Sequence, residues 1–229
     1  MPRKQHRLYV PGLLYSGILD RALAGIRRKV RELVVAGGLF PVLDICCGTG
    51  IQCGRLRKDR SPVFGLDINI RMTKYAAARH PGVMFVCADA MSLPFPPRYF
   101  QGLIISFALH EKPPVIRPRL LAAAKEVLAP EGRIVLVDFE QPWSAGSSAA
   151  LRYVSVIERL AGREHYTNGR DFLIRGGLRT ILKDNGLAEV SRFNIESGCC
   201  AVILAGVSGQ EIYPVRRSSE ESKRYRPRP

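Results

Sequence analysis

The sequence predicts an α/β fold: a Rossmann-like, doubly wound and mostly parallel sheet of seven strands with a C-terminal antiparallel hairpin. Short apolar segments alternate with segments of helical periodicity through residues 18–139, which is the rhythm of such a sheet. The apolar segments show almost no polar alternation, as expected of parallel strands that are buried on both faces. The last two apolar segments lie too close together for a parallel crossover of about a dozen residues, so they are expected to pair antiparallel.

A helix is expected first, over Ile18–Val35, because apolar side chains recur at helical spacing from Leu23 to Val34 and two glycines follow. Five strands are then expected, at Phe40–Cys46, Val63–Ile68, Val83–Ala88, Leu103–Leu109 and Arg133–Phe139. The helices between them are expected at Gln52–Leu56, Arg71–Ala78 and Pro118–Leu128, with a turn at Ala129–Gly132. Two helices and the two hairpin strands are expected last, at Ala149–Leu160, Phe172–Asn185, Glu189–Ile195 and Ala201–Val207.

The composition is typical of one soluble globular domain. Apolar residues make up 46% of the chain and charged residues 24%. No apolar stretch is long enough to span a bilayer and no signal-peptide cleavage site is evident, so a cytoplasmic location is expected. The six cysteines form neither a CxxC pair nor a disulfide pattern, so no metal site is expected.

The formal net charge of +15 is concentrated at the two ends of the chain. Residues 1–31 hold eight basic residues and one Asp, a net +7, and residues 214–229 hold six basic and two acidic residues, a net +4. Such charge favours contact with an anionic surface, so the termini are candidates to hold the protein peripherally at a membrane or to contact nucleic acid. A solubilising helix face and a disordered tail explain the same charges without any partner.

A glycine-rich turn, VLDICCGTG at residues 42–50, follows the first strand and opens a helix. Ligands of open α/β sheets bind at such carboxyl ends of strands, where glycines let the backbone approach them closely. The third glycine of a dinucleotide-binding fingerprint is missing after Gly48 and Gly50. Asp44 stands four residues before Gly48, and a carboxylate there suits a ligand with an ammonium group better than a pyrophosphate.

Two further acids end the next two strands. Asp67 lies 19 residues after Gly48, where a carboxylate is placed to accept hydrogen bonds from two ribose hydroxyls. Asp89 ends the third strand, where a carboxylate is placed to accept from an adenine amino group. Together with Asp44, these acids indicate an adenosine ligand that carries a cationic amino acid and no phosphate.

Four segments, VLDICCGTG, VFGLDIN, VCADAMSLPF and LAPEGRIVLVDF, resemble in order and spacing the motifs of class I S-adenosylmethionine-dependent methyltransferases. Within that class they are most similar to the ubiquinone/menaquinone-biosynthesis group, over about Phe40–Glu140. The resemblance implies S-adenosyl-L-methionine as the cofactor and these residues as its ligands: Asp44, Cys46, Gly48, Gly50, Asp67, Ile68, Asp89, Ala90 and Ser106. Cys46 stands where the common pattern has glycine, although some quinone methyltransferases also read Cys-Cys-Gly-Thr at this turn.

His110 and Glu111 follow the fourth strand, at the lip that faces the transferred methyl group in this family. Methyl transfer needs a base only where the acceptor must lose a proton. His110 is the candidate base because its ordinary pKa is near neutral, with Glu111 a weaker candidate; alternatively, His110 only shapes the pocket. The pocket for the acceptor is expected to include Tyr15, His165 and Tyr166 besides His110, although ordinary packing explains these residues equally well.

The sequence thus predicts methyl transfer from S-adenosylmethionine to a small or lipophilic acceptor, such as a quinol, a phenol or an amine. One alternative is an RNA methyltransferase that uses the basic termini, but the chain lacks an Asn/Asp-Pro-Pro-aromatic run after the fourth strand and an RNA-binding module. Another is a non-catalytic protein that binds the cofactor or a partner. An arsenite methyltransferase is disfavoured because Cys46, Cys47 and Cys53 all lie in or beside the cofactor turn.

One methyltransferase domain is expected over residues 1–215, followed by a basic, disordered tail at 216–229. Its parts are a helical lid at 1–36, a cofactor-binding core at 37–140, helices of the acceptor pocket at 141–187 and the terminal hairpin at 188–208. The oligomeric state is left open by the sequence.

Overall fold

The computed structural model describes residues 23–57, 61–140, 163–195 and 199–209. Seven strands of these residues form one sheet in the order β3-β2-β1-β4-β5-β7-β6. Their bounds are β1 Val42–Ile45, β2 Val63–Asp67, β3 Met84–Cys87, β4 Phe100–Ser106, β5 Leu128–Phe139, β6 Leu187–Asn194 and β7 Cys200–Val207. The first five strands run parallel, and β7 pairs antiparallel with both β5 and β6. The predicted doubly wound sheet with a terminal antiparallel hairpin is therefore confirmed.

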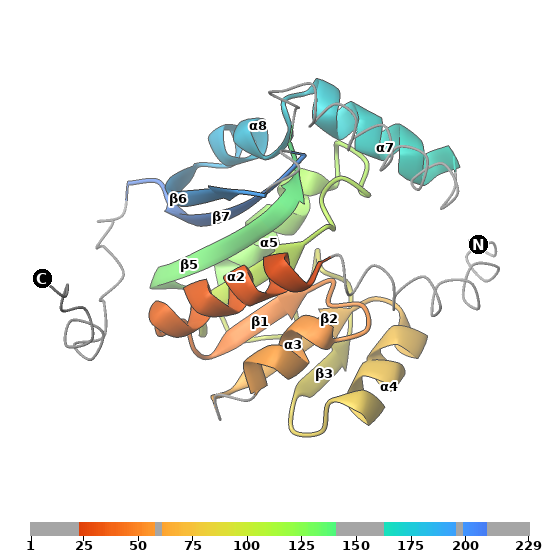
Figure 1. Ribbon diagram of the computed structural model, residues 1–229, viewed down its shortest axis with the longest axis vertical. Helices are drawn as coiled ribbons and strands as arrows, with labels where there is room; N and C mark the ends of the chain where they lie inside the picture. The colour runs from red at the N-terminus through yellow and green to blue at the C-terminus, as the bar shows by residue number, and fades with distance from the viewer. Residues whose placement is uncertain (1–22, 58–60, 141–162, 196–198, 210–229) are drawn as a thin grey trace, which may run out of the picture.

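Helices cover both faces of this sheet (Figure 1). Their bounds are α2 Ala24–Ala36, α3 Ile51–Leu56, α4 Ile70–Arg79, α5 Arg117–Val127, α7 Arg163–Ile174 and α8 Gly177–Asp184. The apolar sides of α2 and α3 pack with one set of strand side chains, which includes Val42, Ile104 and Val135. Those of α5 and α8 pack with the alternate set, because successive side chains of a strand point to opposite faces. This two-sided burial explains why the strands contain almost no polar residues.

Local signals set the ends of several helices. The α4 helix begins after Asn69, whose side-chain oxygen accepts a hydrogen bond from the backbone N–H of Arg71 at 3.0 Å. The α5 helix carries Pro118 in its first turn, where a missing N–H costs nothing. The α3 helix follows Gly50, which adopts a left-handed conformation with φ of 72°.

Three expected elements differ from the structure. The fourth strand, expected at 103–109, is β4 at Phe100–Ser106, and the positive φ of 52° at Phe107 ends it. The segment expected as a turn at 129–132 belongs to β5, whose first residue, Leu128, already pairs with Phe100. The single helix expected at 172–185 is two helices, α7 and α8, because Gly176 and Gly177 adopt positive φ angles of 98° and 60° that interrupt a helix. The helix expected at 149–160 and the tail at 216–229 lie outside the described residues.

A buried guanidinium fastens α7 to the loop that follows β4. Arg117 is 2% exposed, and its Nε donates to the carbonyl oxygens of Leu109 at 3.1 Å and Lys112 at 2.9 Å. Its two terminal nitrogens donate to the carbonyl oxygen of Asn168 at 2.7 Å and to the carboxylate of Asp171 at 2.8 Å. Because Asn168 and Asp171 belong to α7, this one side chain fixes α7 beside the end of β4.

We predict that Arg117→Met lowers the free energy of unfolding by about 2–4 kcal/mol, because it leaves buried carbonyl oxygens and part of a charge pair without a donor. Chemical denaturation monitored by circular dichroism measures this change. Arg175→Met is the matched control, since Arg175 also pairs with Asp171 at 2.8 Å but is 61% exposed. Arg175→Met should lower the free energy of unfolding by less than about 0.5 kcal/mol. Equal losses in the two variants would contradict the role given to Arg117.

Candidate functional site

The candidate site lies where the strand order reverses. The chain passes from β1 to β2 and β3 on one side, and then returns to β4 on the other side of β1. At such a point the loops after the two neighbouring strands diverge and leave a crevice at their carboxyl ends. Asp44 in β1, the turn after β1, and Ser106 at the end of β4 all line one cavity of about 170 Å³ there.

The turn after β1 contains two residues whose conformation matters for a ligand. Gly48 has a φ of +53°, and a Cβ atom built on it would meet no atom within 4 Å, so its backbone faces open space. Gly50 has a φ of +72°, and a Cβ atom there would lie 2.6 Å from the Phe85 ring and 2.8 Å from the Cβ atom of Ala76. Gly48 thus leaves room for a ligand, whereas Gly50 is required by packing.

Cys46, in the same turn, also has a positive φ, of 61°. This conformation favours glycine, which explains why glycine is the common residue at this position of the motif. Burial raises the pKa of the Cys46 thiol to about 12, so the sulfur stays a protonated thiol at neutral pH. That protonation state argues further against a thiolate chemistry for Cys46.

Asp44 is a buried carboxylate inside the cavity. It is 3% exposed, and the Cys53 thiol donates to its Oδ2 at 3.5 Å. Burial raises the pKa of Asp44 to about 7, although the Cys53 hydrogen bond and the charge of Arg27 act in the opposite direction. A cation that bound here would favour the charged form of this carboxyl.

Asp67 and Asp89 lie at the ends of the next two strands, as the sequence predicts, and both shape the backbone around them. Asp67 accepts the backbone N–H of Gly48 at Oδ2 and that of Asn69 at Oδ1, both at 2.9 Å. Asp89 accepts the backbone N–H of Met91 at 2.9 Å. A carboxylate oxygen that accepts one such bond keeps capacity for another, so both acids can still bind ligand hydroxyl or amino groups.

Apolar surface for a flat ring lies beside these acids. Ile68, directly after β2, is 66% exposed, which is unusual for so large an apolar side chain. Ala90, directly after Asp89, is buried at 8% exposure. The cavity of about 170 Å³ is smaller than an ordinary ligand pocket of roughly 300–1,000 Å³. A ligand of cofactor size would therefore extend from the cavity toward the exposed Ile68.

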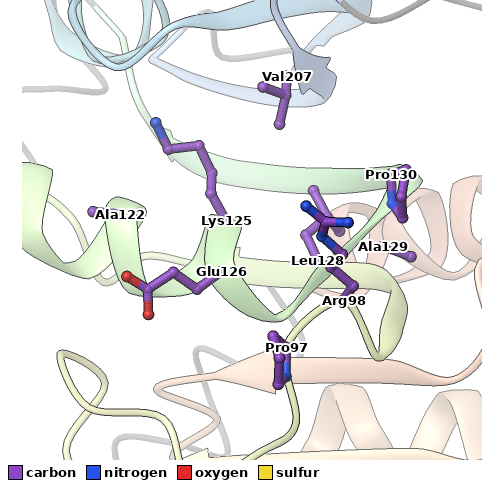
Figure 2. A pocket seen from close by; sticks show the side chains of 9 residues that line it. All are labelled: Pro97, Arg98, Ala122, Lys125, Glu126, Leu128, Ala129, Pro130 and Val207. Atoms are coloured by element: carbon purple, nitrogen blue, oxygen red, sulfur yellow. The ribbon is translucent and has the colours of Figure 1, made fainter.

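A larger hollow of about 780 Å³ lies elsewhere, at the amino ends of β4 and β5 (Figure 2). It is lined by Pro97, Arg98, Ala122, Lys125, Glu126, Leu128, Ala129, Pro130 and Val207, none of which is a predicted site residue. Figure 2 shows the long side chains of Lys125 and Glu126 rising from α5 at its side. Since ligands of open α/β sheets bind at the carboxyl ends of strands, the smaller cavity is the candidate site.

His110 is buried beside β5 and held by Asp138. His110 is 2% exposed, and its Nδ1 lies 2.6 Å from Oδ1 of Asp138. Oδ2 of Asp138 accepts the backbone N–H groups of Leu109 at 3.1 Å and His110 at 3.2 Å. Because an ionised carboxylate only accepts, Nδ1 carries the ring proton and Nε2 is the basic nitrogen.

Glu111 and His165, one of the predicted pocket residues of α7, lie beside His110. The rings of His110 and His165 meet edge to face with centroids 5.7 Å apart, and Nε2 of His165 lies 3.5 Å from Oε1 of Glu111. Burial raises the pKa of Glu111, which the charges of His110 and His165 partly counter. Tyr166 follows His165 in the first turn of α7 and is half-buried, whereas Tyr15 lies outside the described residues.

The sequence reasoning missed two residues of this site. Asp138 was expected within an apolar strand and was assigned no role. A single acid within an apolar strand was the signal that could have identified it, as the same signal identified Asp44. Arg27 is not among the predicted site residues, yet it lines the cavity with Asp44 because α2 lies across this end of the sheet. The roles of the nine predicted cofactor ligands remain predictions.

Residues 42–132 match a protein-family model described as a methyltransferase domain. Among curated relatives, the chain is 35% identical over 133 residues to a demethylmenaquinone methyltransferase of Renibacterium salmoninarum, a match that covers 56% of this chain and 55% of the relative. It is 28% identical to a demethylmenaquinone methyltransferase of Streptomyces griseus over 77% of this chain and 80% of that relative. The chain thus spans about half the length of the first relative and four fifths of the second.

Two solved structures show the same fold. The magnesium protoporphyrin IX methyltransferase of Synechocystis PCC 6803 with bound SAH superposes with a TM-score of 0.58 at 19% identity, over 80% of this chain and 83% of that one. The N-methyltransferase NodS of Bradyrhizobium japonicum superposes with a TM-score of 0.56 at 15% identity, over 81% of this chain and 96% of that one. The fold predicted from the alternation of strands and helices is thus that of known methyltransferases.

We predict that Asp44→Asn stabilises the ligand-free protein more at about pH 8 than at about pH 5. In the folded protein the pKa of Asp44 is about 7, above its ordinary value of 3.8. The free-energy cost of ionising this carboxyl in the folded state is therefore absent below pH 3.8 and grows with pH until about pH 7. The gain in unfolding free energy should be larger by roughly 2–3 kcal/mol at the higher pH. Urea denaturation at both pH values measures it, with the exposed Asp184→Asn as the control. A gain that did not vary with pH would contradict the raised pKa.

Proposed function

We propose that this S-adenosylmethionine-dependent methyltransferase transfers the methyl group to a ring carbon of a quinol-type acceptor. The observation that carries the proposal is the buried His110–Asp138 pair, since His110 belongs to the loop after β4 whose first residue, Phe107, lines the cavity with Asp44. The names of its relatives support it, since two are demethylmenaquinone methyltransferases and another is a 2-phytyl-1,4-naphtoquinone methyltransferase.

The residues present fit S-adenosylmethionine. The Asp44 carboxyl is buried, and among the described residues the Cys53 thiol donates to it and the charge of Arg27 favours its ionised form, so it suits the ammonium group of the amino-acid part. The open space beside Gly48 leaves room for the chain of that part. Asp67 suits the ribose hydroxyls and Asp89 the adenine amino group, while Ile68 offers an apolar surface for the adenine ring.

The protein's own task in the reaction is to position the acceptor and to take a proton from it. When bound, S-adenosylmethionine supplies an electrophilic methyl group on a positively charged sulfur. A ring carbon beside a phenolic hydroxyl is a weak nucleophile until that hydroxyl loses its proton. Nε2 of His110 accepts this proton, and the Asp138 carboxylate stabilises the imidazolium that forms. Methylation of the phenolate gives a neutral dienone, and loss of the hydrogen on the methylated carbon to solvent water restores its aromaticity as a phenolate. The phenolate takes back the proton held by His110, so that one proton is released overall.

A lipophilic acceptor is consistent with a site at the surface of a membrane. No helix in the part of the chain that the structure describes is long and apolar enough to cross one. The α2 helix lines the cavity and also carries exposed basic side chains, such as that of Arg28 at 77% exposure. Contact between these charges and anionic lipid headgroups would bring the site to a membrane-dissolved acceptor. Residues 1–22 and 214–229, which together carry a net charge of +7, lie outside the described residues.

We predict that the purified chain binds S-adenosylmethionine and that Asp67→Ala weakens this binding by about 1–3 kcal/mol, because two ribose hydroxyls lose their acceptor. Isothermal titration calorimetry measures both affinities, and circular dichroism checks that the variant stays folded. Asp184→Ala, an exposed change on α8, is the control and should bind as the parent does. If neither the cofactor nor its thioether product bound to the parent chain, the proposed activity would be excluded.

We predict that His110→Ala lowers the rate of methyl transfer to a short-chain 1,4-naphthoquinol by about 10²–10⁴-fold without changing cofactor affinity. Asp138→Asn should lower the rate as well, because it removes the charge that stabilises the imidazolium. The rate is followed by chromatography of the methylated product under anaerobic conditions. Full activity of His110→Ala would remove this residue as the proton acceptor. Cofactor binding without transfer to any phenolic or amine acceptor would instead favour a non-catalytic protein.

A further inference from the structure

Three side chains with metal-binding groups meet beside the proposed acceptor site. His110 and Glu111 come from the loop after β4, and His165 comes from the first turn of α7. One ligand atom from each of the three lies within 4.8 Å of the other two. We propose that His110, Glu111 and His165 bind a divalent transition-metal cation, for which Zn²⁺ is the best match, although the sequence predicted no metal site.

The chemistry of the three groups favours zinc. Two imidazoles and one carboxylate form a mixed nitrogen and oxygen set, which suits Zn²⁺ rather than Mg²⁺ or Ca²⁺. Zinc bonds of about 2.0–2.2 Å place tetrahedral ligand atoms roughly 3.3 Å apart. Nε2 of His165 and Oε1 of Glu111 are already 3.5 Å apart, and these two side chains are 27% and 37% exposed. Both can therefore move the short distance that closes a site around the buried His110.

The surroundings of His110 match those of a metal-binding histidine. Such a histidine commonly donates its second ring N–H to a carboxylate, which fixes the ring and makes the ligand nitrogen more basic. Nδ1 of His110 makes this contact with Asp138 at 2.6 Å, so Nε2 would be the metal ligand. The charge also fits, because Asp138 and Glu111 bring two carboxylates to the group. Lys112 partly offsets the charge of Glu111, since its Nζ lies 3.9 Å from Oε2 of that residue.

Hydrogen bonds from the side chains of Asn168 and Arg117 hold the backbone that carries the three ligand residues. The side chain of Asn168 donates to the carbonyl oxygen of Glu111 at 2.9 Å, which joins the loop after β4 directly to α7. Arg117 bonds to the carbonyl oxygens of Lys112 and Asn168 at 2.9 and 2.7 Å. The ligand-bearing segments are thus fixed relative to each other without the cation, which limits the ordering cost of binding it.

The site has a consequence for the reaction, which rests on the proposed function. Nε2 of His110 would bind the cation, and it is the same nitrogen that takes the proton from the acceptor. A nitrogen that holds a metal ion cannot also take a proton. Bound Zn²⁺ should therefore inhibit methyl transfer, and removal of the cation should restore it.

The binding test uses the full chain, stripped with a chelator and titrated with Zn²⁺ in a calorimeter. We expect one Zn²⁺ per chain at this site, with affinity at least about 100-fold lower in His165→Ala and in Glu111→Gln. Asp138→Asn should weaken binding by about 10–100-fold, as loss of a carboxylate that orients a metal-binding histidine does. His80→Ala, which removes a histidine of α4's C-terminal end, is the matched control and should leave the affinity unchanged.

Cobalt spectroscopy and activity complete the test. The absorption spectrum of the protein with Co²⁺ bound in place of Zn²⁺ identifies the ligand atoms. Absence of a sulfur-to-metal charge-transfer band would support the nitrogen and oxygen ligands, whereas such a band would overturn the site in favour of the cysteines. Unchanged zinc affinity in both His165→Ala and Glu111→Gln would also overturn it. Methyl transfer of each protein is compared with and without Zn²⁺, and His165→Ala should show at least about 10-fold weaker inhibition than the parent. Zinc binding that leaves transfer unaffected would keep the metal site and exclude His110 as the proton acceptor.

Discussion

The buried carboxylate of Asp138 organises the chemical end of this site. Its Oδ1 contacts Nδ1 of His110 and accepts the backbone N–H of Phe139, and its Oδ2 accepts the backbone N–H groups of Leu109 and His110. A carboxylate this deeply buried needs such donors, because an unpaired charge in an apolar core is costly. The need to satisfy Asp138 therefore fixes both the course of the loop after β4 and the orientation of the His110 ring.

Asp44, on the β1 side of the crevice, has different hydrogen-bond donors from Asp138. Asp44 is as deeply buried as Asp138, but a thiol is its hydrogen-bond donor, and its pKa is raised accordingly. Backbone N–H groups and His110 thus satisfy Asp138, whereas Asp44 is the acid that we propose for a cationic ligand. Cys46 and Phe107, which follow β1 and β4, both adopt positive φ angles and both line the cavity between these strands. Backbone strain of this kind commonly concentrates at functional sites.

Arg117 connects this crevice to α7. Its hydrogen bonds to the loop after β4 and to Asn168 place the first turn of α7 beside His110, so that His165 reaches Glu111. The position of the proposed metal site thus depends on the same buried side chain that holds the loop in place. For this reason His165, which lies beyond the last of the cofactor motifs in sequence, takes part in the proposed acceptor site.

The sequence by itself determined the sheet and the gathering of three acids at one edge of it. Strands that are apolar throughout can be buried only between two layers of helices, and acids at strand ends such as Asp44, Asp67 and Asp89 gather at one edge because parallel strands end together. Only the tertiary structure decided the acceptor side. Asp138, Arg117 and His165 act through contacts between segments distant in sequence, and no local periodicity encodes such contacts. The sequence expected His110 and His165 to share one pocket, but the close approach of their ligand atoms to that of Glu111 depends on the packing of α7 against the loop after β4.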